Sequence, residues 1–227
     1  MHHIKEFSRF AKSYGTYNVI QREVAKELAQ TVTTNPQCII DLGCGSGTFY
    51  DALDGDVERY IAVDLSDKML ELHPKDKNIE FIHADFDDKK LFEKLKSSQC
   101  QYLVSSSSLQ WSQDLKTLFQ RIYSLEIPFA LALFTANTFK QVHQTAKLSS
   151  PLLTSSEVSK LAEEIFGITC NTKTYTLKFD SKRELFSYIK KSGVSGTKRQ
   201  LNYKETKRLM QEYPLDYLEF EVIFLIS

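Results

Sequence analysis

Glycines and an aspartate gather in one short segment, which reads CIIDLGCGSGT. An apolar run ends at Gly43, and Gly45 and Gly47 follow at alternate positions. Glycines at such a place let the backbone turn tightly and let a ligand approach bare peptide groups. The spacing differs from the dinucleotide fingerprint G-x-G-x-x-G, because Thr48 stands where the last glycine would be. Asp41, just before the turn, would repel a phosphate and attract an ammonium group.

Further aspartates stand where the next strands would end. Asp64 closes the run RYIAVD, and Asp85 follows the run IEFIHA. In a parallel sheet the carboxyl ends of the strands meet at one edge, so these acids should lie near the glycine turn. An acid at the end of the second strand can bind both ribose hydroxyls, and Asp85 with Phe86 suits an adenine ring. A ligand with an ammonium group, a ribose and an adenine but no phosphate is S-adenosylmethionine.

A parallel sheet is needed to bring these residues together. Short apolar runs alternate with helical segments through residues 36–136, which predicts an α/β fold with helices on both faces of the sheet. The helical segments are 47–54, 66–73, 89–97 and 114–125. Before the sheet, residues 4–30 predict two helices broken near Gly15. After it we expect a loop or lid at 137–155, helices at 155–166, 181–192 and 203–212, and strands at 169–179 and at the end of the chain.

Length, charge and cysteine content limit the possible size of the core, the partners and the compartment of the protein. The chain has 227 residues, enough for one sizeable core, and its 29 Lys and Arg balance 29 Asp and Glu. This balance argues against nucleic-acid and membrane partners, which favour a basic excess. No apolar run approaches the roughly 18 residues of a spanning helix, and the first residues lack the apolar core of a secretion signal. The four cysteines lack C-x-x-C spacing, so we expect no zinc site and a reduced, cytoplasmic protein.

The motifs resemble those of the class I S-adenosylmethionine-dependent methyltransferases. DLGCGSG is similar to the first motif of that family, AVDLS with Met69 to the second, and HADFDD to the third. The resemblance implies a doubly wound, mostly parallel, seven-stranded Rossmann-like sheet whose last strand is antiparallel. The predicted cofactor-binding residues are Asp41, Gly43, Cys44, Gly45, Gly47, Asp64, Leu65, Met69, Asp85, Phe86, Ser105 and Ser106.

Three further stretches resemble the malonyl-acyl-carrier-protein O-methyltransferases of biotin synthesis. They are FSRFAKSYGTYNVIQ, the segment SSSSLQWSQDLKTLFQRIYSL, and a helical insert that ends in Tyr-Pro before YLEFEVIFL. The resemblance implies methyl transfer to the free carboxylate of a malonyl group on acyl carrier protein, an early step toward the pimeloyl moiety of biotin. One departure is Pro128, which is displaced from the family's Leu-x-Pro-x-Gly turn, and the glycine is absent. That departure leaves the geometry of this turn open.

The resemblance implies one methyltransferase domain over residues 1–227. Its parts are an N-terminal helical cap at 1–34, a cofactor-binding core at 36–136, a substrate lid and helical insert at 137–212, and a final strand at 213–227. We expect a monomer.

The acceptor chemistry limits what the protein must supply. A carboxylate is already ionised at neutral pH, so no general base is required. The site must align two reactants and exclude water. Tyr14, on the N-terminal helix, is the catalytic candidate, because a hydroxyl can orient a carboxylate without neutralising it. Gln21, Trp111 and His143 are candidates for substrate binding.

The helical insert carries an excess of positive charge. Residues 182–208 contain nine Lys and Arg against two Glu, a net charge of +7. A basic surface suits an acidic partner such as acyl carrier protein, and we expect Lys198 and Arg199 to contact it. RNA could use the same surface, although no N-P-P-Y or N-P-P-F motif of amine methylation follows the fourth strand.

Other functions stay open at this point. The acceptor could be malonyl coenzyme A or another small carboxylic acid. The chain could also be a non-catalytic subunit with a methyltransferase fold. The intact glycine turn with its three aspartates argues against that last alternative, since a subunit without activity has no need of them.

Overall fold

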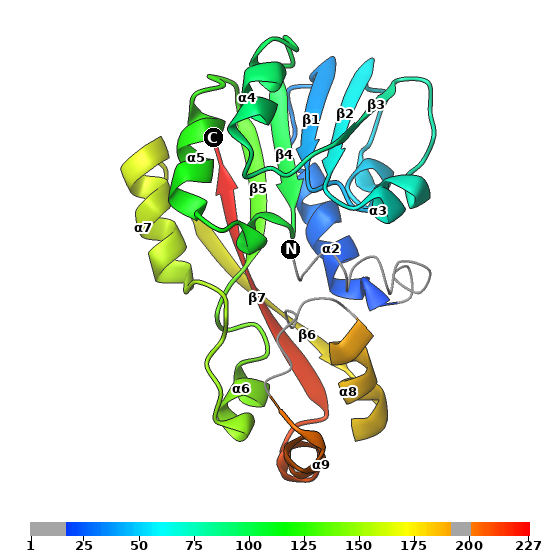
Figure 1. Cartoon of the computed structure of the whole chain (residues 1–227), viewed down its shortest axis with the longest axis vertical. Coiled ribbons are helices and arrows are strands. Elements are labelled where there is room, and N and C mark those ends of the chain that lie inside the picture. The colour runs from blue at the N-terminus through cyan, green and yellow to red at the C-terminus, as the bar shows by residue number, and fades with distance from the viewer. Residues whose placement is uncertain (1–16, 192–200) are drawn as a thin grey trace.

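One sheet organises the part of the chain that the structure describes, residues 17–191 and 201–227 of a computed structural model (Figure 1). Its strands are β1 (Cys38–Leu42), β2 (Arg59–Asp64), β3 (Ile79–His83), β4 (Tyr102–Ser106), β5 (Phe129–Phe134), β6 (Asn171–Lys178) and β7 (Tyr217–Ile226). Their order is β3-β2-β1-β4-β5-β7-β6. The first five strands pair in parallel, and β7 runs antiparallel to both β5 and β6. The predicted fold, with its antiparallel last strand, is confirmed.

Helices cover both faces of this sheet. They are α2 (Val19–Ala29), α3 (Asp67–Leu72), α4 (Lys89–Lys96), α5 (Leu115–Tyr123), α6 (Lys140–Ala146), α7 (Ser155–Phe166), α8 (Lys182–Lys191) and α9 (Tyr203–Glu212), with short 3₁₀ turns η1 (Tyr50–Ala52) and η2 (Leu109–Trp111). Side chains alternate along a strand, so Ile39 faces α2 while Ile40 faces the layer of α4, α5 and α7. The central strands are therefore buried on both sides, as in other doubly wound sheets.

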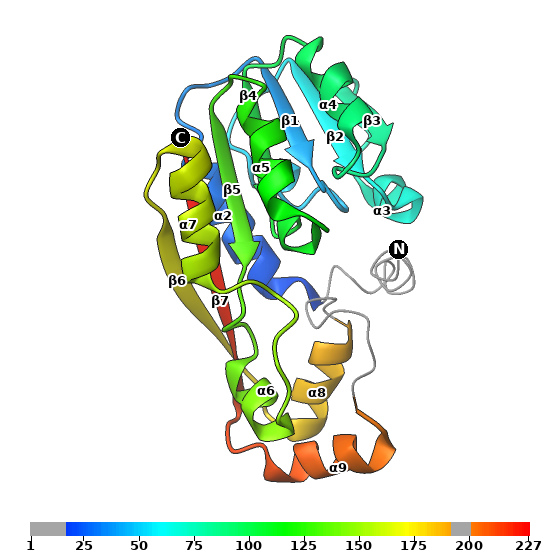
Figure 2. The same cartoon turned by 60° about the vertical axis from the view of Figure 1, so that its left-hand side comes forward.

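The helix α2 fulfils one of the two N-terminal predictions. Ile20, Val24, Ala25 and Leu28 recur at helical spacing and are all buried against the sheet. The other predicted helix, before Gly15, lies outside the described residues. At the far end of the molecule β6 and β7 extend beyond the rest of the sheet, and α6, α8 and α9 gather there (Figure 2).

Two segments differ from their sequence-based prediction. Residues 47–54 were expected to be helical but form only η1, because three glycines with positive φ precede it and the chain leaves the turn before a full helix can start. The expected loop at 137–155 contains α6, a short helix that is flanked by Phe139 and Lys147, both of which have a left-handed backbone conformation. Neither residue is of a type that marks a helix end in a sequence, which would be Ser, Thr, Asp or Asn before the helix and Gly after it. The helix was therefore not evident from the residues.

The expectation that the cysteines are reduced is wrong for two of the four. Cys38 and Cys100 form a disulfide, with their Cα atoms 4.7 Å apart, while Cys44 and Cys170 are thiols. The physical reason is strand pairing, because Ile39 of β1 lies beside Tyr102 of β4. This register brings Cys38, one residue before Ile39, close to Cys100, two residues before Tyr102, although 62 positions separate the two cysteines. Among the helices of residues 17–191 and 201–227, none is both long and apolar enough to cross a membrane.

Candidate functional site

The glycine turn connects β1 to the end of β2. The backbone N–H groups of Gly43 and Cys44 both donate to the Val63 carbonyl, at 2.8 and 3.0 Å. Gly43 has φ +72°, and a Cβ there would stand 2.4 Å from the Cβ of Ser108, so only glycine fits. Gly45 also has a positive φ, +55°, but no atom lies within 4 Å of where its Cβ would be. The turn therefore packs tightly on one side and leaves the backbone at Gly45 open for a ligand.

Asp64 sits at the end of β2 and is tied to this turn. Its carboxylate accepts hydrogen bonds from the Gly45 N–H at 2.9 Å and the Ser66 N–H at 2.8 Å. Burial raises the pKa of this carboxyl, and the two backbone donors oppose that rise. Each carboxylate oxygen keeps a second lone pair, so the group can still accept from the hydroxyls of a ribose. Ribose binding by Asp64 stays a prediction.

Asp41 is the one acid of the three that is fully buried. Its Oδ2 accepts a hydrogen bond from the Tyr60 hydroxyl at 2.6 Å. Its Oδ1 has no hydrogen-bond partner among the described residues. Burial raises the pKa of Asp41 to about 7, opposed by the Tyr60 hydrogen bond and assisted by the negative charge of Asp64. A buried acceptor without a donor fits a ligand that brings an ammonium group.

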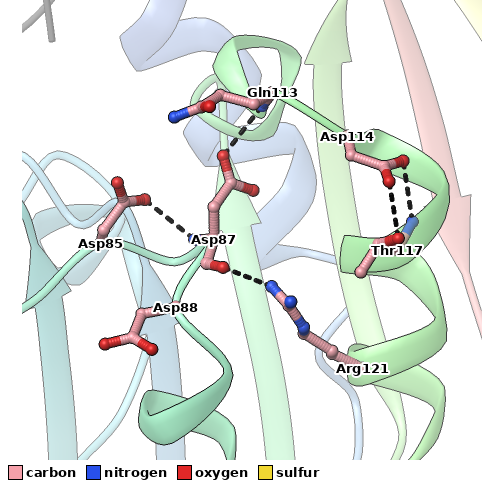
Figure 3. Close-up of a pocket in the computed structure, with 7 residues that line it drawn as sticks. All are labelled: Asp85, Asp87, Asp88, Gln113, Asp114, Thr117 and Arg121. Atoms are coloured by element: carbon pink, nitrogen blue, oxygen red, sulfur yellow. Dashed lines mark hydrogen bonds between the residues drawn. The ribbon is translucent and has the colours of Figure 1, made fainter.

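Asp85 lies in the loop after β3, beside a pocket of about 350 Å³ (Figure 3). Its Oδ1 accepts from the Asp87 N–H at 2.9 Å, which leaves the other oxygen available. The remaining acids of this pocket are engaged: Asp88 caps α4, Asp114 caps α5, and the Asp87 carboxylate accepts from the Ser112 hydroxyl at 2.6 Å and the Gln113 N–H at 2.8 Å. An adenine contact by Asp85 therefore stays a prediction.

Phe86 lies close to the glycine turn. The Cε1 atom of its ring stands 3.6 Å from the position that a Cβ on Gly43 would take. The ring is half-buried and packs against the core layer of α4 and α5. The structure thus brings the ring beside the turn, and its contact with an adenine stays a prediction.

The serines at the end of β4 and just after it mainly hold the edge of the sheet together. The hydroxyls of Ser105 and Ser108 both donate to the Leu42 carbonyl, at 2.6 and 2.8 Å, and lie 2.8 Å from each other. Ser105 is fully buried, whereas Ser106 is half-buried. These bonds clamp the end of β4 onto the end of β1, directly under the glycine turn. Contacts of Ser105 and Ser106 with the cofactor stay a prediction.

The remaining predicted cofactor residues line the same edge of the sheet. Met69 on α3 is buried, and Leu65 is half-buried between Asp64 and the helix. The Cys44 thiol is buried, and burial with two nearby carboxylates raises its pKa, so it stays protonated. Gly47, the third glycine, has φ +90°, and its Cβ would stand 2.6 Å from Pro74.

The predicted substrate residues are only partly described. Gln21 on α2 is buried, Trp111 ends η2 and packs against the core, and His143 on α6 is half-buried with a pKa lowered by burial. Binding of the substrate by these three residues stays a prediction. The catalytic candidate Tyr14 and the proposed docking residues Lys198 and Arg199 lie outside the described residues.

Sequence reasoning assigned no role to three polar residues near the turn. Tyr60 bonds Asp41. His73 is buried with its Nε2 unpartnered among the described residues, and it packs against the rings of Tyr60 and Phe81. Asn18 is also buried, with its Nδ2 donating to Thr48 at 3.4 Å. Only register and packing bring these residues together, so residue spacing could not have revealed them.

Comparison with known proteins agrees with this geometry. Residues 39–126 match the family described as "Methyltransferase domain". The chain is 25% identical to malonyl-acyl-carrier-protein O-methyltransferase of Priestia megaterium, over 86% of this chain and 82% of the relative. It is 24% identical to the protein of the same name from Acinetobacter baylyi, over 96% of this chain and 88% of the relative.

Solved structures share the fold at low identity. The YcgJ protein of Bacillus subtilis aligns with a TM-score of 0.59 at 12% identity, covering 88% of this chain and 96% of that one. The plantazolicin methyltransferase BpumL, solved in complex with SAH, aligns with a TM-score of 0.52 at 14% identity, covering 98% of this chain and 93% of that one.

The matched domain identifies residues 39–126 as a methyltransferase domain, whose cofactor is S-adenosylmethionine, and the sheet order is the one expected for that fold. Asp41 with its unpartnered Oδ1, and the open backbone at Gly45, fit the aminoacyl end of that cofactor. Across most of its length the chain is similar to the malonyl-acyl-carrier-protein O-methyltransferases.

Proposed function

We propose that this protein methylates the free carboxylate of a malonyl thioester carried by acyl carrier protein, an early step in making the pimeloyl part of biotin. The observation that supports this acceptor is the length of the similarity. The matched methyltransferase domain ends at residue 126, yet relatives of this name align over as much as 96% of the chain. The segments that distinguish acceptors among methyltransferases lie outside the cofactor-binding core, so similarity there carries information about the acceptor.

The chemistry asks little of the protein beyond positioning. When bound, the cofactor supplies a methyl group on a positively charged sulfur. Asp41 and Asp64 would hold its aminoacyl and ribose parts, and the turn at Gly45 would let it lie against the backbone. The acceptor carboxylate must be aligned with the methyl group in a site without bulk water. In well-oriented intramolecular reactions, alignment and the avoided reorganisation of solvent lower the activation barrier by about 7–11 kcal/mol. Tyr14 would orient this carboxylate through its hydroxyl.

The carrier protein would dock on the helices α8 and α9. These helices present exposed cations, Arg183, Lys190, Lys204 and Lys207, at the end of the molecule where β6 and β7 extend. Other cations of the same region are committed to the protein, because Lys182 donates to the Leu215 carbonyl at 2.6 Å and Lys191 to the Tyr17 hydroxyl at 2.9 Å. An exposed basic helix pair attracts an acidic partner and speeds its association.

The decisive experiment is a methyl-transfer assay with purified protein and three acceptors: malonyl acyl carrier protein, malonyl coenzyme A and free dicarboxylic acids. We expect the highest kcat/KM with the carrier-bound malonyl group. Equal rates with all three acceptors would point to a methyltransferase of small acids in general. No transfer to any of them, with cofactor bound, would reject the proposed acceptor class.

The role of Tyr14 has its own test. Tyr14→Phe should lower the rate of methyl transfer while leaving cofactor affinity nearly unchanged, because it removes one donor to the acceptor. The loss of one positioned donor costs about 2–4 kcal/mol in an enzyme site. Normal turnover in this variant would remove Tyr14 from the site.

A further inference from the structure

A buried pair of side chains lies beneath the glycine turn. Asp41 on β1 and Tyr60 on β2 are 1% and 0% exposed, and the Tyr60 hydroxyl stands 2.6 Å from Asp41 Oδ2. The strands pair Asp41 with Ala62, so Tyr60 reaches it diagonally across the sheet. A bond this short between buried groups fixes the rotation of the carboxylate. It also determines that the other oxygen, Oδ1, is the one left without a protein donor.

Tyr60 is itself held from behind. Its ring packs edge-on against Tyr50, with centroids 4.9 Å apart, and lies 6.1 Å from the ring of His73. Tyr50 is anchored in turn by a 2.8 Å hydrogen bond to Asp76. The hydroxyl of Tyr60 therefore has little freedom to leave Asp41. Burial and the neighbouring carboxylate raise the pKa of Tyr60, so the hydroxyl remains the donor of the pair.

We propose that Tyr60 is a positioning residue for the cofactor: it holds Asp41 with Oδ1 directed to the cofactor's ammonium group, and binding of that group releases a proton from Asp41. The step is balanced, because the neutral carboxyl loses its proton to solvent and the resulting carboxylate pairs with an ammonium that keeps all of its protons. The inference concerns the cofactor alone, so it stands or falls independently of the acceptor.

The electrostatic surroundings fit this coupling. Titratable groups around the pair are Cys44, Tyr50, Asp64, His73 and Lys75. The only cation among them, Lys75, acts on Cys44 and His73 and is not among the causes that shift the pKa of Asp41. Cys44 stays a thiol and His73 stays neutral, because burial raises the pKa of the first and lowers that of the second. The ligand would bring the compensating charge. Without it, Asp41 holds a proton in about half of the molecules near pH 7, since its pKa is about 7.

The test measures binding rather than turnover. S-adenosylhomocysteine, which carries the same ammonium group and cannot react, would be titrated by calorimetry at about pH 5.5 and about pH 7.0, where an α-amino group is still mostly protonated. If only the carboxylate form binds, a pKa of about 7 predicts that wild-type affinity rises about 15-fold over this interval. At about pH 7.0, titrations in buffers of different ionisation enthalpy should show release of about 0.5 proton per ligand.

Variants separate positioning from simple stability. Tyr60→Phe removes a hydrogen bond that favours the anion, and should weaken binding about 5-fold near pH 7.0 and about 10-fold near pH 5.5. Tyr102→Phe is the matched control, because Tyr102 is also buried on this face of the sheet and makes no bond to Asp41. In an Asp41→Asn background, proton release should disappear and the further change Tyr60→Phe should have less than about a 2-fold effect.

Other outcomes would overturn the proposal. If wild-type protein releases no proton on binding, Asp41 does not titrate with the ligand, and this result needs no variant to fold. If Tyr60→Phe weakens binding by the same factor at both pH values, or no more than Tyr102→Phe does, then Tyr60 contributes only to packing. Melting temperatures of each variant, measured at both pH values, identify any loss of affinity that comes from unfolding.

Discussion

The carboxylate of Asp64 accepts a hydrogen bond from the backbone N–H of Gly45 at 2.9 Å, which joins the end of β2 to the turn that follows β1. The same carboxylate accepts from Ser66 at the start of α3. One side chain thus sets the position of the loop on each side of the cofactor edge. A change at Asp64 should therefore affect both ligand binding and the shape of the turn.

Asp64→Ala should weaken cofactor affinity more than 10-fold, because hydrogen bonds to a charged group are worth about 1.5–3 kcal/mol each. Asp64→Asn keeps one acceptor and should lose less, although its amide NH₂ would face one of the two backbone donors. Calorimetry with S-adenosylhomocysteine measures both. Asp67→Ala is the control, since that carboxylate lies three positions away on α3 and its side chain is 69% exposed. Unchanged affinity in Asp64→Ala would refute the site.

Two glycines of the turn should respond differently to alanine. A Cβ at Gly43 would collide with Ser108, so Gly43→Ala should cost roughly 2–5 kcal/mol of stability, as the sum of backbone strain and overpacking. At Gly45 the Cβ meets no protein atom, so Gly45→Ala should cost only about 1–2 kcal/mol from its positive φ.

The ligand should distinguish the second variant. A Cβ at Gly45 would occupy space that we assign to the cofactor, so Gly45→Ala should lose about 10-fold or more in affinity while still folding. Gly55→Ala is the matched control, because Gly55 also has a positive φ and no atom within 4 Å of its would-be Cβ, but lies outside the glycine turn. Equal affinities in Gly45→Ala and Gly55→Ala would show that the cofactor does not pass Gly45.

The pH dependence of stability follows from Asp41. Its pKa is raised to about 7 in the folded protein from an ordinary 3.8, so the folded state holds more protons between these values. Stability of the ligand-free protein should therefore fall as pH rises from about 4 to about 7, by on the order of 4 kcal/mol for this group alone. In Asp41→Asn this part of the slope should vanish, leaving that of Asp64, whose pKa burial also raises. Urea denaturation at several pH values measures the difference, and parallel curves would contradict the assignment.

The positions of Asp41, Asp64 and Asp85 were predictable because each follows an apolar run, and a parallel sheet brings strand ends to one edge. The number of strands and the antiparallel last strand came from the family resemblance, whereas the strand order was not predicted. Contacts that depend on register were not predictable. The Tyr60–Asp41 bond and the disulfide between Cys38 and Cys100 join residues 19 and 62 positions apart, and nothing in the local sequence marks either pair.

Local signals also failed where tertiary packing decides the backbone. The helix α7 begins with a capping box in which Thr154 and Glu157 exchange hydrogen bonds, and its start was predicted closely. The helix α6 has no such cap and begins after Phe139, a buried residue with φ 58° that contacts Phe220. Packing of that aromatic pair, rather than helix propensity, determines where α6 lies.

The last prediction concerns docking of the carrier protein on α9. On this helix Lys204 and Lys207 are exposed beside Tyr203, an aromatic residue that is 75% exposed. The double change Lys204→Glu with Lys207→Glu replaces attraction of an acidic partner by repulsion. We expect a higher KM for the carrier-bound malonyl group, caused mainly by slower association, with kcat nearly unchanged. The matched control, Lys90→Glu with Lys96→Glu on α4, alters net charge equally on the opposite face of the sheet.

The salt dependence of KM and the response of a small substrate also test docking of the carrier protein on α9. Raising salt from about 0.05 to about 0.5 M shortens the Debye length from about 14 Å to about 4 Å, so it should raise KM more for the wild type than for the α9 variant. Turnover of a small malonyl thioester should stay the same in both, because neither lysine is proposed to touch the reacting atoms. Equal losses on carrier-bound and small substrates would mean that α9 shapes the active site. No loss on either, or the same loss in the α4 control, would show that the carrier protein does not dock on α9.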